Sequence, residues 1–139
     1  MFYPWDITIP ANTPEATPIK QKLILTAGII KNVHIKFPAG CHGMVKVRLF
    51  RWGFQLIPLV DGEWITGDDE TVPTETYYEL SATPFSLMFK GCSPDTSYDH
   101  TISVRIEMEP ALKESDLQVI EQLKEIKDSL QPSEVPTNG

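Results

Sequence analysis

The sequence predicts an all-β fold: an antiparallel β-sandwich or jelly roll of about eight strands, followed by one C-terminal α-helix. Two observations support this. Short runs of alternating apolar and polar residues recur about every 8 to 12 residues, with turn-forming residues between them. After Pro110 the apolar residues switch to helical spacing. We therefore expect a sandwich domain over residues 1–110, an amphipathic helix over residues 111–131 and a flexible tail over residues 132–139.

The longest alternating stretch runs from Gly28 to Arg51 and predicts one antiparallel hairpin at the centre of the sandwich. Its inward positions are expected to be Val33, Ile35, Phe37, Val45, Val47 and Leu49. The intervening positions, among them Lys36, Lys46 and Arg48, give a largely basic outward face. The segment from Pro38 to Gly43 is expected to be the loop between the arms, because proline cannot donate to a ladder.

Further strands are predicted on both sides of this hairpin. They are expected at Asp6–Ile9, Ile19–Thr26, Phe54–Val60, Glu63–Ile65, Thr74–Leu80, Phe85–Phe89 and Thr101–Met108. Gly67–Pro73 is expected to be an acidic loop. Phe2, Tyr3 and Trp5 precede the first strand and are expected to form a loose aromatic arm.

The helix is predicted from a capping box and an apolar stripe. Ser115 and Gln118 have the spacing of the box, and Pro132 ends the helix. The stripe consists of Val119, Leu123, Ile126 and Leu130. A helix of this length is marginal alone in water, so its stripe must be covered. Packing on its own sandwich and a short coiled coil with other copies, above two strands, are both open interpretations.

Length and composition indicate one globular domain of 139 residues with a formal net charge of -7. This acidic balance argues against a general nucleic-acid binder. The sequence has no apolar run of about 18 residues, so we expect no membrane span. Its first residues do not resemble a signal peptide, so we expect Cys41 and Cys92 to be buried free thiols, with a disulfide between them as the alternative.

Motifs for metal binding or catalysis are lacking. Cys41, His42, Cys92 and His100 are zinc-ligand types without paired ligand spacing, so we predict no zinc site. The acidic residues from Asp61 to Glu70 do not match a calcium loop, so a solvated loop is predicted instead. No nucleophile elbow or phosphate-binding loop occurs, and the prediction is a protein without enzymatic activity or cofactor.

The charges are unevenly distributed along the chain. Five of the 12 basic residues lie in the central stretch: Lys31, Lys36, Lys46, Arg48 and Arg51. Residues 52–89 contain no Lys or Arg, and their carboxylates are Asp61, Glu63, Asp68, Asp69, Glu70, Glu75 and Glu79. The favoured interpretation pairs Lys36, Lys46 and Arg48 with carboxylates of neighbouring strands in the same sheet. The alternative is complementary patches on different subunits.

Several segments together resemble a known class of proteins. In chain order they are IPANTP, FPAGCHGMVKV, GEWITGDDE, TYYELSATPFSLMF and TISVRIEM. Over residues 5–109 this layout resembles small β-sandwich virion proteins of tailed bacteriophages, the capsid decoration or accessory class. The resemblance implies a protein without catalytic residues, made in the host cytoplasm, that often forms trimers and clamps neighbouring capsid subunits.

We therefore expect a non-enzymatic structural protein of a viral particle, a homo-oligomer with a trimer favoured, whose partner is the major capsid protein or another virion protein. No nucleic acid and no membrane are expected as partners. The expected partner-binding residues are Phe2, Tyr3, Trp5, Lys36, Lys46, Arg48, Val119, Leu123, Ile126 and Leu130. The alternative is a carbohydrate-binding sandwich that uses Trp52, Trp64, Tyr77 or Tyr78 as a stacking platform.

Overall fold

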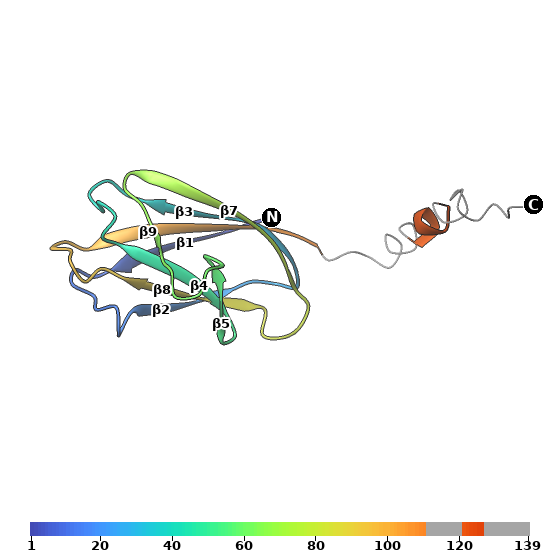
Figure 1. Ribbon diagram of the computed structural model, residues 1–139, viewed down its shortest axis with the longest axis horizontal. Coiled ribbons are helices and arrows are strands. Elements are labelled where there is room, and N and C mark those ends of the chain that lie inside the picture. The colour runs from blue at the N-terminus through green and yellow to red at the C-terminus, as the bar shows by residue number, and fades with distance from the viewer. Residues whose placement is uncertain (111–120, 127–139) are drawn as a thin grey trace, which may run out of the picture.

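The computed structural model describes residues 1–110 and 121–126, and the described residues form two antiparallel β-sheets packed face to face (Figure 1). The four-stranded sheet has the order β1-β9-β3-β7 and the five-stranded sheet the order β2-β8-β4-β5, with β6 paired to β4. The strands are β1 (Phe2–Ile9), β2 (Ile19–Ile24), β3 (Gly28–Phe37), β4 (Lys46–Arg51), β5 (Phe54–Ile57), β6 (Ile65–Thr66), β7 (Glu70–Leu80), β8 (Ser86–Cys92) and β9 (His100–Glu109). The predicted all-β sandwich is confirmed.

The core lies between the sheets and is built from the inward positions that the alternation predicted. The six inward residues of the central stretch are all buried: Val33, Ile35, Phe37, Val45, Val47 and Leu49. On β9 the alternation likewise buries Ile102, Val104, Ile106 and Met108. Each strand thus contributes one face to a shared apolar layer, and burial of that layer is the main driving force for folding.

The predicted hairpin between β3 and β4 is wrong. β3 pairs with β7 and β9, whereas β4 pairs with β5, β6 and β8, so the two strands lie in different sheets. The connection from Pro38 to Val45 crosses from one sheet to the other. Alternation specifies which side chains of a strand point inward, but it does not specify which strand pairs with it. Both arms therefore keep their buried faces and lose the predicted pairing.

The aromatic N-terminus is part of a strand and is not a loose arm. Tyr3 lies opposite Ile106 and Trp5 opposite Val104 in the pairing of β1 with β9. Both rings are half-buried against the core and stack on each other with 6.2 Å between their centroids. Phe2 points the other way and is 63% exposed. Because β1 is an edge strand, Pro4 is tolerated within it.

Other strand boundaries also differ from the prediction, most clearly those of β7 and β5. β7 begins at Glu70, because Glu70 to Pro73 pair with β3, so the acidic loop is shorter than expected. Pro73 is tolerated there because β7 is also an edge strand. β5 ends at Ile57, directly before Pro58.

A buried arginine fixes one connection between the sheets. The side chain of Arg51, at the end of β4, is almost fully buried and lies with its guanidinium 3.9 Å from the centre of the Trp52 ring. Its guanidinium donates to the carbonyl oxygens of Ala82 (2.8 Å), Pro84 and Ser86 (3.4 Å) in the connection between β7 and β8. Carbonyl oxygens thus compensate most of the desolvation of this charge.

The predicted C-terminal helix is described only in part. Residues 121–126 are helical, and within them Leu123 and Ile126 are 60% and 55% exposed. Val119, Leu130 and the predicted tail lie outside the described residues. No described helix is long and apolar enough to cross a membrane.

Truncation of the core is expected to destabilise the sandwich. Ile35→Ala should lower the free energy of unfolding by about 2–4 kcal/mol and Val47→Ala by somewhat less, because both side chains are fully buried between the sheets. Ile24→Ala is the control, because Ile24 is exposed on β2; it should change stability by less than about 0.5 kcal/mol. Urea denaturation measures all three variants, and wild-type stability of Ile35→Ala and Val47→Ala would contradict the assigned inner face.

Candidate functional site

One outer surface of the sandwich is strongly basic. It belongs to the five-stranded sheet, and we call it the basic face: Lys20, Lys22, Lys46, Arg48 and Lys90. These residues alternate along β2, β4 and β8 with the buried residues of the core, so they share the side that faces away from it. Lys20 lies directly opposite Lys90, and Lys90 directly opposite Arg48. Like charges directly opposite each other destabilise a sheet, so this row lowers the stability of the isolated domain.

Aromatic rings hold part of the basic face in place. The Arg48 guanidinium lies 3.6 Å from the centre of the Trp64 ring, and the Lys90 ammonium lies 4.2 Å from that of Phe50. Both contacts are cation–π interactions. One face of each ring is therefore covered by a cation, and the surface presents charge in place of open aromatic rings.

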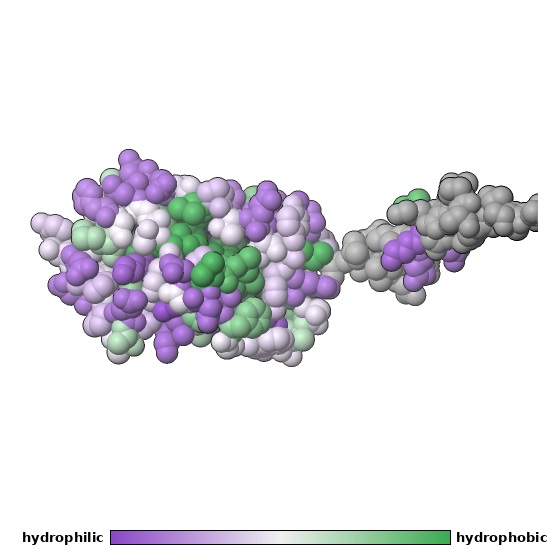
Figure 2. Space-filling model, viewed as in Figure 1, coloured by the Kyte–Doolittle hydropathy of each residue, from purple (hydrophilic) through white to green (hydrophobic). Residues whose placement is uncertain are grey.

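Gln55 connects Arg48 to the segment that follows β5. Its side-chain oxygen accepts a hydrogen bond from Arg48 Nη1 at 3.2 Å, and its side-chain nitrogen lies within hydrogen-bond distance of three carbonyl oxygens, that of Val60 at 3.0 Å among them. Leu59, beside Val60, is 82% exposed. Figure 2 shows hydrophobic surface in the middle of the visible face, where β4 and β5 lie in Figure 1. Exposed apolar residues thus adjoin the basic face.

Only one carboxylate among the described residues reaches the basic face. Glu15 accepts a hydrogen bond from Trp64 Nε1 at 3.0 Å and lies 3.8 Å from Lys46 Nζ. The other ion pairs of the described residues are Lys31–Glu109 and His42–Asp68. Lys46 therefore has a carboxylate partner, whereas Lys20, Lys22, Arg48 and Lys90 have none among the described residues.

The favoured interpretation of the charges, pairing with carboxylates of neighbouring strands in one sheet, is wrong for Lys36, Lys46 and Arg48. Lys36 is exposed on the four-stranded sheet, between Thr71 and Ser103. For Arg48 the reason is topological: the acidic strand β7 pairs with β3, while Arg48 lies in the other sheet on β4. Lys46 finds its carboxylate on the segment before β2 and not on a neighbouring strand.

The structure brings together some of the predicted partner-binding residues and separates others. Lys46 and Arg48 lie on the basic face, whereas Lys36 and the aromatic residues of β1 belong to the other sheet. Sequence reasoning missed Lys20, Lys22 and Lys90. Their alternation with Leu23 and Phe89 placed them outward, but the pairing of β2 with β8 and of β8 with β4 could not be known from it.

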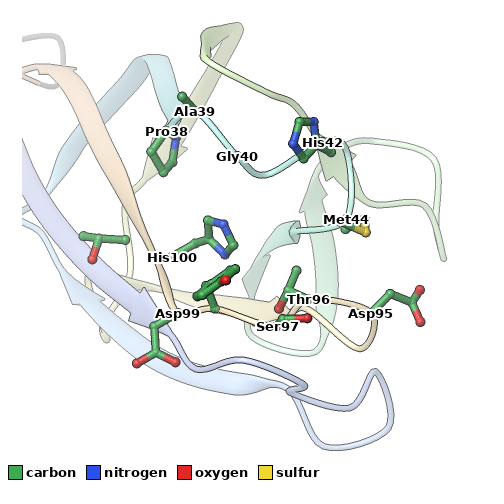
Figure 3. Close-up of a pocket in the computed structure, with 12 residues that line it drawn as sticks. Pro38, Ala39, Gly40, His42, Met44, Asp95, Thr96, Ser97, Asp99 and His100 are labelled. Carbon is green, nitrogen blue, oxygen red and sulfur yellow. The ribbon is translucent and has the colours of Figure 1, made fainter.

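A pocket of about 620 Å³ lies where the β3–β4 and β8–β9 connections meet (Figure 3). Its lining comes from Pro38, Ala39, Gly40, His42, Met44 and residues 95–101. His42 and His100 both line it, while Cys41 and Cys92 are buried free thiols, as predicted. Burial raises the pKa of both thiols, which keeps them protonated and unreactive near neutral pH. The described residues contain no group of three or more His, Cys, Asp or Glu side chains suited to a metal ion.

Asp68 fixes the β3–β4 connection from outside the pocket. One carboxylate oxygen accepts hydrogen bonds from the backbone amides of Gly40 at 3.0 Å and His42 at 3.1 Å, and the other lies 3.5 Å from His42 Nδ1. The amide of His42, with a smaller effect of its ring charge, lowers the pKa of Asp68. At this position the acidic loop stabilises a turn through backbone amides.

The four aromatic residues proposed as a sugar-stacking platform do not form an open row. The Arg48 guanidinium covers one face of Trp64, and Tyr78 packs against Phe54 with 6.0 Å between the ring centroids. Trp52 and Tyr77 are exposed, but Trp52 lies in the turn between β4 and β5, whereas Tyr77 lies within β7 of the other sheet. Arg51 also covers one face of Trp52.

No family model matches the chain, and no curated protein matches it. The basic face and the pocket are therefore the features from which a function can be inferred.

The pH dependence of stability should reveal the Asp68 turn. Because folding lowers the pKa of Asp68, its stabilising effect is present above the unfolded value of about 3.9 and is lost as the pH falls through the lower folded value. Asp68→Asn should therefore be less stable than the wild type at pH 7, with the difference vanishing in acid. Asp61→Asn, a control in another exposed loop, should show no such change. Thermal denaturation across pH tests this, and a difference between wild type and Asp68→Asn that grows in acid would contradict it.

Proposed function

We propose that this chain is a non-enzymatic structural protein of a viral particle that binds acidic surfaces of neighbouring capsid subunits through its basic face. The observation that carries the proposal is the concentration of five cations on one sheet face of a chain whose net charge is -7. Four of them have no carboxylate partner among the described residues. Carboxylates of a partner would relieve the repulsion between the neighbouring cations Lys20, Lys90 and Arg48. The position of this row would then fix the orientation of the bound partner.

The same geometry favours an acidic protein over a nucleic acid. Proteins that bind single strands stack bases on open aromatic rings, whereas Lys90 occupies one face of Phe50 and Arg48 occupies one face of Trp64. The negative net charge of the whole chain also opposes a long polyanion. A folded partner with a local acidic patch meets the basic face without approaching the rest of the molecule.

Apolar surface beside the basic face completes the proposed interface. Leu59 and Val60 are exposed, and Gln55 holds the backbone of Val60 next to Arg48. Specific interfaces commonly combine an apolar centre with a polar or charged rim. In the proposed complex the cations attract the acidic partner, and Leu59 and Val60 form the part of the contact from which water is excluded.

The C-terminal helix supplies the proposed self-association. Leu123 and Ile126 are more than half exposed in the described helix, and the same sequence stripe continues to Val119 and Leu130, outside the described residues. Aliphatic residues at this spacing are typical of helices that pair with other copies. A homotrimer joined by these helices presents several basic faces to one particle and so gains avidity.

Charge reversal on the basic face should weaken binding to an acidic polypeptide. Lys20→Glu with Lys90→Glu should lower the affinity for poly-L-glutamate by about tenfold, because each exposed ion pair contributes on the order of 0.2–1 kcal/mol and reversal adds repulsion. The matched control is Lys36→Glu with Arg105→Glu, which changes the net charge equally on the exposed face of the other sheet.

Fluorescence anisotropy at low and moderate salt measures both double variants, with a single-stranded oligonucleotide as the competing probe. We expect the control to bind poly-L-glutamate nearly as the wild type does, and salt to weaken the wild type. Equal losses in the two double variants, or tighter binding of the oligonucleotide, would contradict the assigned partner.

Removal of the C-terminal segment should separate assembly from folding. A chain that ends at Pro110 should keep the far-ultraviolet signal of its strands, because the described core lies within residues 1–110, and should sediment as a smaller species than the full chain. Leu123→Ser with Ile126→Ser in the full chain should act in the same direction. A full-length protein that stays monomeric at high concentration would remove the support for self-association.

A further inference from the structure

We propose that the pocket between the β3–β4 and β8–β9 connections binds one neutral sugar residue, with His100 as its central hydrogen-bonding group. This proposal is independent of the basic face, which lies on the outer side of the five-stranded sheet. It also differs from stacking on Trp52, Trp64, Tyr77 or Tyr78, because none of these four rings lines the pocket.

His100 occupies a position where the fold calls for an apolar residue. Ile102, Val104 and Ile106 point into the core from β9, and His100 is the next residue of the same alternation, at the end of the sandwich. Its Nδ1 atom is buried and has no hydrogen-bond partner in the protein. The other ring nitrogen, Nε2, faces Gly40 of the lining and lies 3.7 Å from the position of a Cβ built on that glycine, so it is the atom that a ligand in the pocket meets.

The side chain of His100 points into the pocket. In Figure 3 the imidazole projects from β9 into the space between the backbone at Gly40 and the segment that carries Thr96 and Ser97. Asp68 holds the Gly40 and His42 amides from outside, so the upper wall is fixed before a ligand enters. A fixed wall lowers the ordering cost of binding.

The chemistry of the lining excludes several ligand classes. No Lys or Arg lines the pocket, so it offers no permanently charged cation to an anionic ligand. The Asp95 and Asp99 side chains point away from His100 in Figure 3. One carboxylate oxygen of Asp99 accepts a hydrogen bond from the backbone amide of Ala11 at 2.8 Å. An ammonium group at the centre therefore has no counterion beside it. The ligand that fits is uncharged.

An uncharged ligand must still match a lining of mixed polarity. Pro38, Ala39 and Met44 offer apolar surface, while Ser97 and the two histidines offer donors and acceptors. Tyr98, also in the lining, is 78% exposed and provides a ring against which a flat apolar face can stack. A sugar ring has this combination: hydroxyl groups that both donate and accept, and faces made of C–H groups. The volume of about 620 Å³ lies within the range of about 300–1,000 Å³ usual for small-molecule sites.

The test uses free monosaccharides and the full-length protein. D-glucose, D-galactose, D-mannose and N-acetyl-D-glucosamine are titrated to millimolar concentration while backbone amide resonances are followed by NMR. We expect at least one of them to cause saturable shifts confined to residues 38–44 and 95–101. Glucuronate and glucosamine, which carry opposite charges, should bind more weakly than the neutral sugars.

Variants distinguish a binding role of His100 from a structural one. His100→Leu should reduce sugar affinity by about tenfold or more, because it removes the central hydrogen-bonding group. It should unfold at the same temperature as the wild type or a higher one, because it replaces an unpartnered buried nitrogen with apolar surface. His34→Leu, the same substitution on the outer side of β3, is the control and should leave sugar binding unchanged.

Tyr98→Ala is a second test that does not touch the core, and it should weaken sugar binding while leaving the unfolding temperature unchanged. Three results would overturn the proposal: no saturable shift with any of the four neutral sugars, wild-type sugar affinity in both His100→Leu and Tyr98→Ala, or tighter binding of a charged sugar than of every neutral one.

Discussion

The placement of β3 and β4 in different sheets determines which strands become neighbours and where the charges of the sandwich lie. The two strands bury their inner faces in the same core, yet they belong to different sheets. The acidic strand β7 is consequently drawn to β3, and the cations of β4 are joined by those of β2 and β8. Had β3 and β4 formed a hairpin, Lys36 and Arg48 would share a sheet, and the charges of neighbouring strands would be mixed.

The same crossing creates both candidate sites. The residues that cross, Pro38 to Val45, form one wall of the pocket over His100, and Asp68 anchors them through two backbone amides. At the other end of β4, Arg51 binds carbonyl oxygens of the β7–β8 connection. Between these anchors lies Arg48, stacked on Trp64 and hydrogen-bonded to Gln55. A single strand thus links the packing of the core to the charge of the surface.

Local patterns predicted the buried faces, and they could not predict the neighbours. Val33 and Val47 are buried as their alternation indicated, because the period of a strand is a property of its own sequence. Strand pairing depends on distant residues, so the row formed by Lys20, Lys90 and Arg48 was invisible in the sequence. The same is true of Tyr3 and Trp5, which become strand residues only because β9 pairs with them.

His100 illustrates a further limit. In the sequence it is one histidine in a polar loop, with no ligand spacing to single it out. Its position becomes meaningful only when β9 is seen to begin there and to carry an apolar row inward from it. Once the start of the strand is known, the alternation shows that His100 is a polar residue in a row of buried apolar residues. Such an exception is a signal of a possible site. The functional hypotheses therefore rest on pairing and on strand boundaries, the two features that the sequence specifies least directly.

Zero-length cross-linking of lysines to carboxylates on purified viral particles would identify the binding face and its partner in one experiment. The account predicts cross-links from Lys20, Lys22, Lys46 and Lys90 to aspartate or glutamate residues of capsid subunits. Cross-links to capsid subunits that arise instead from Lys31 and Lys36 of the other sheet, or particles that carry none of this protein, would contradict it.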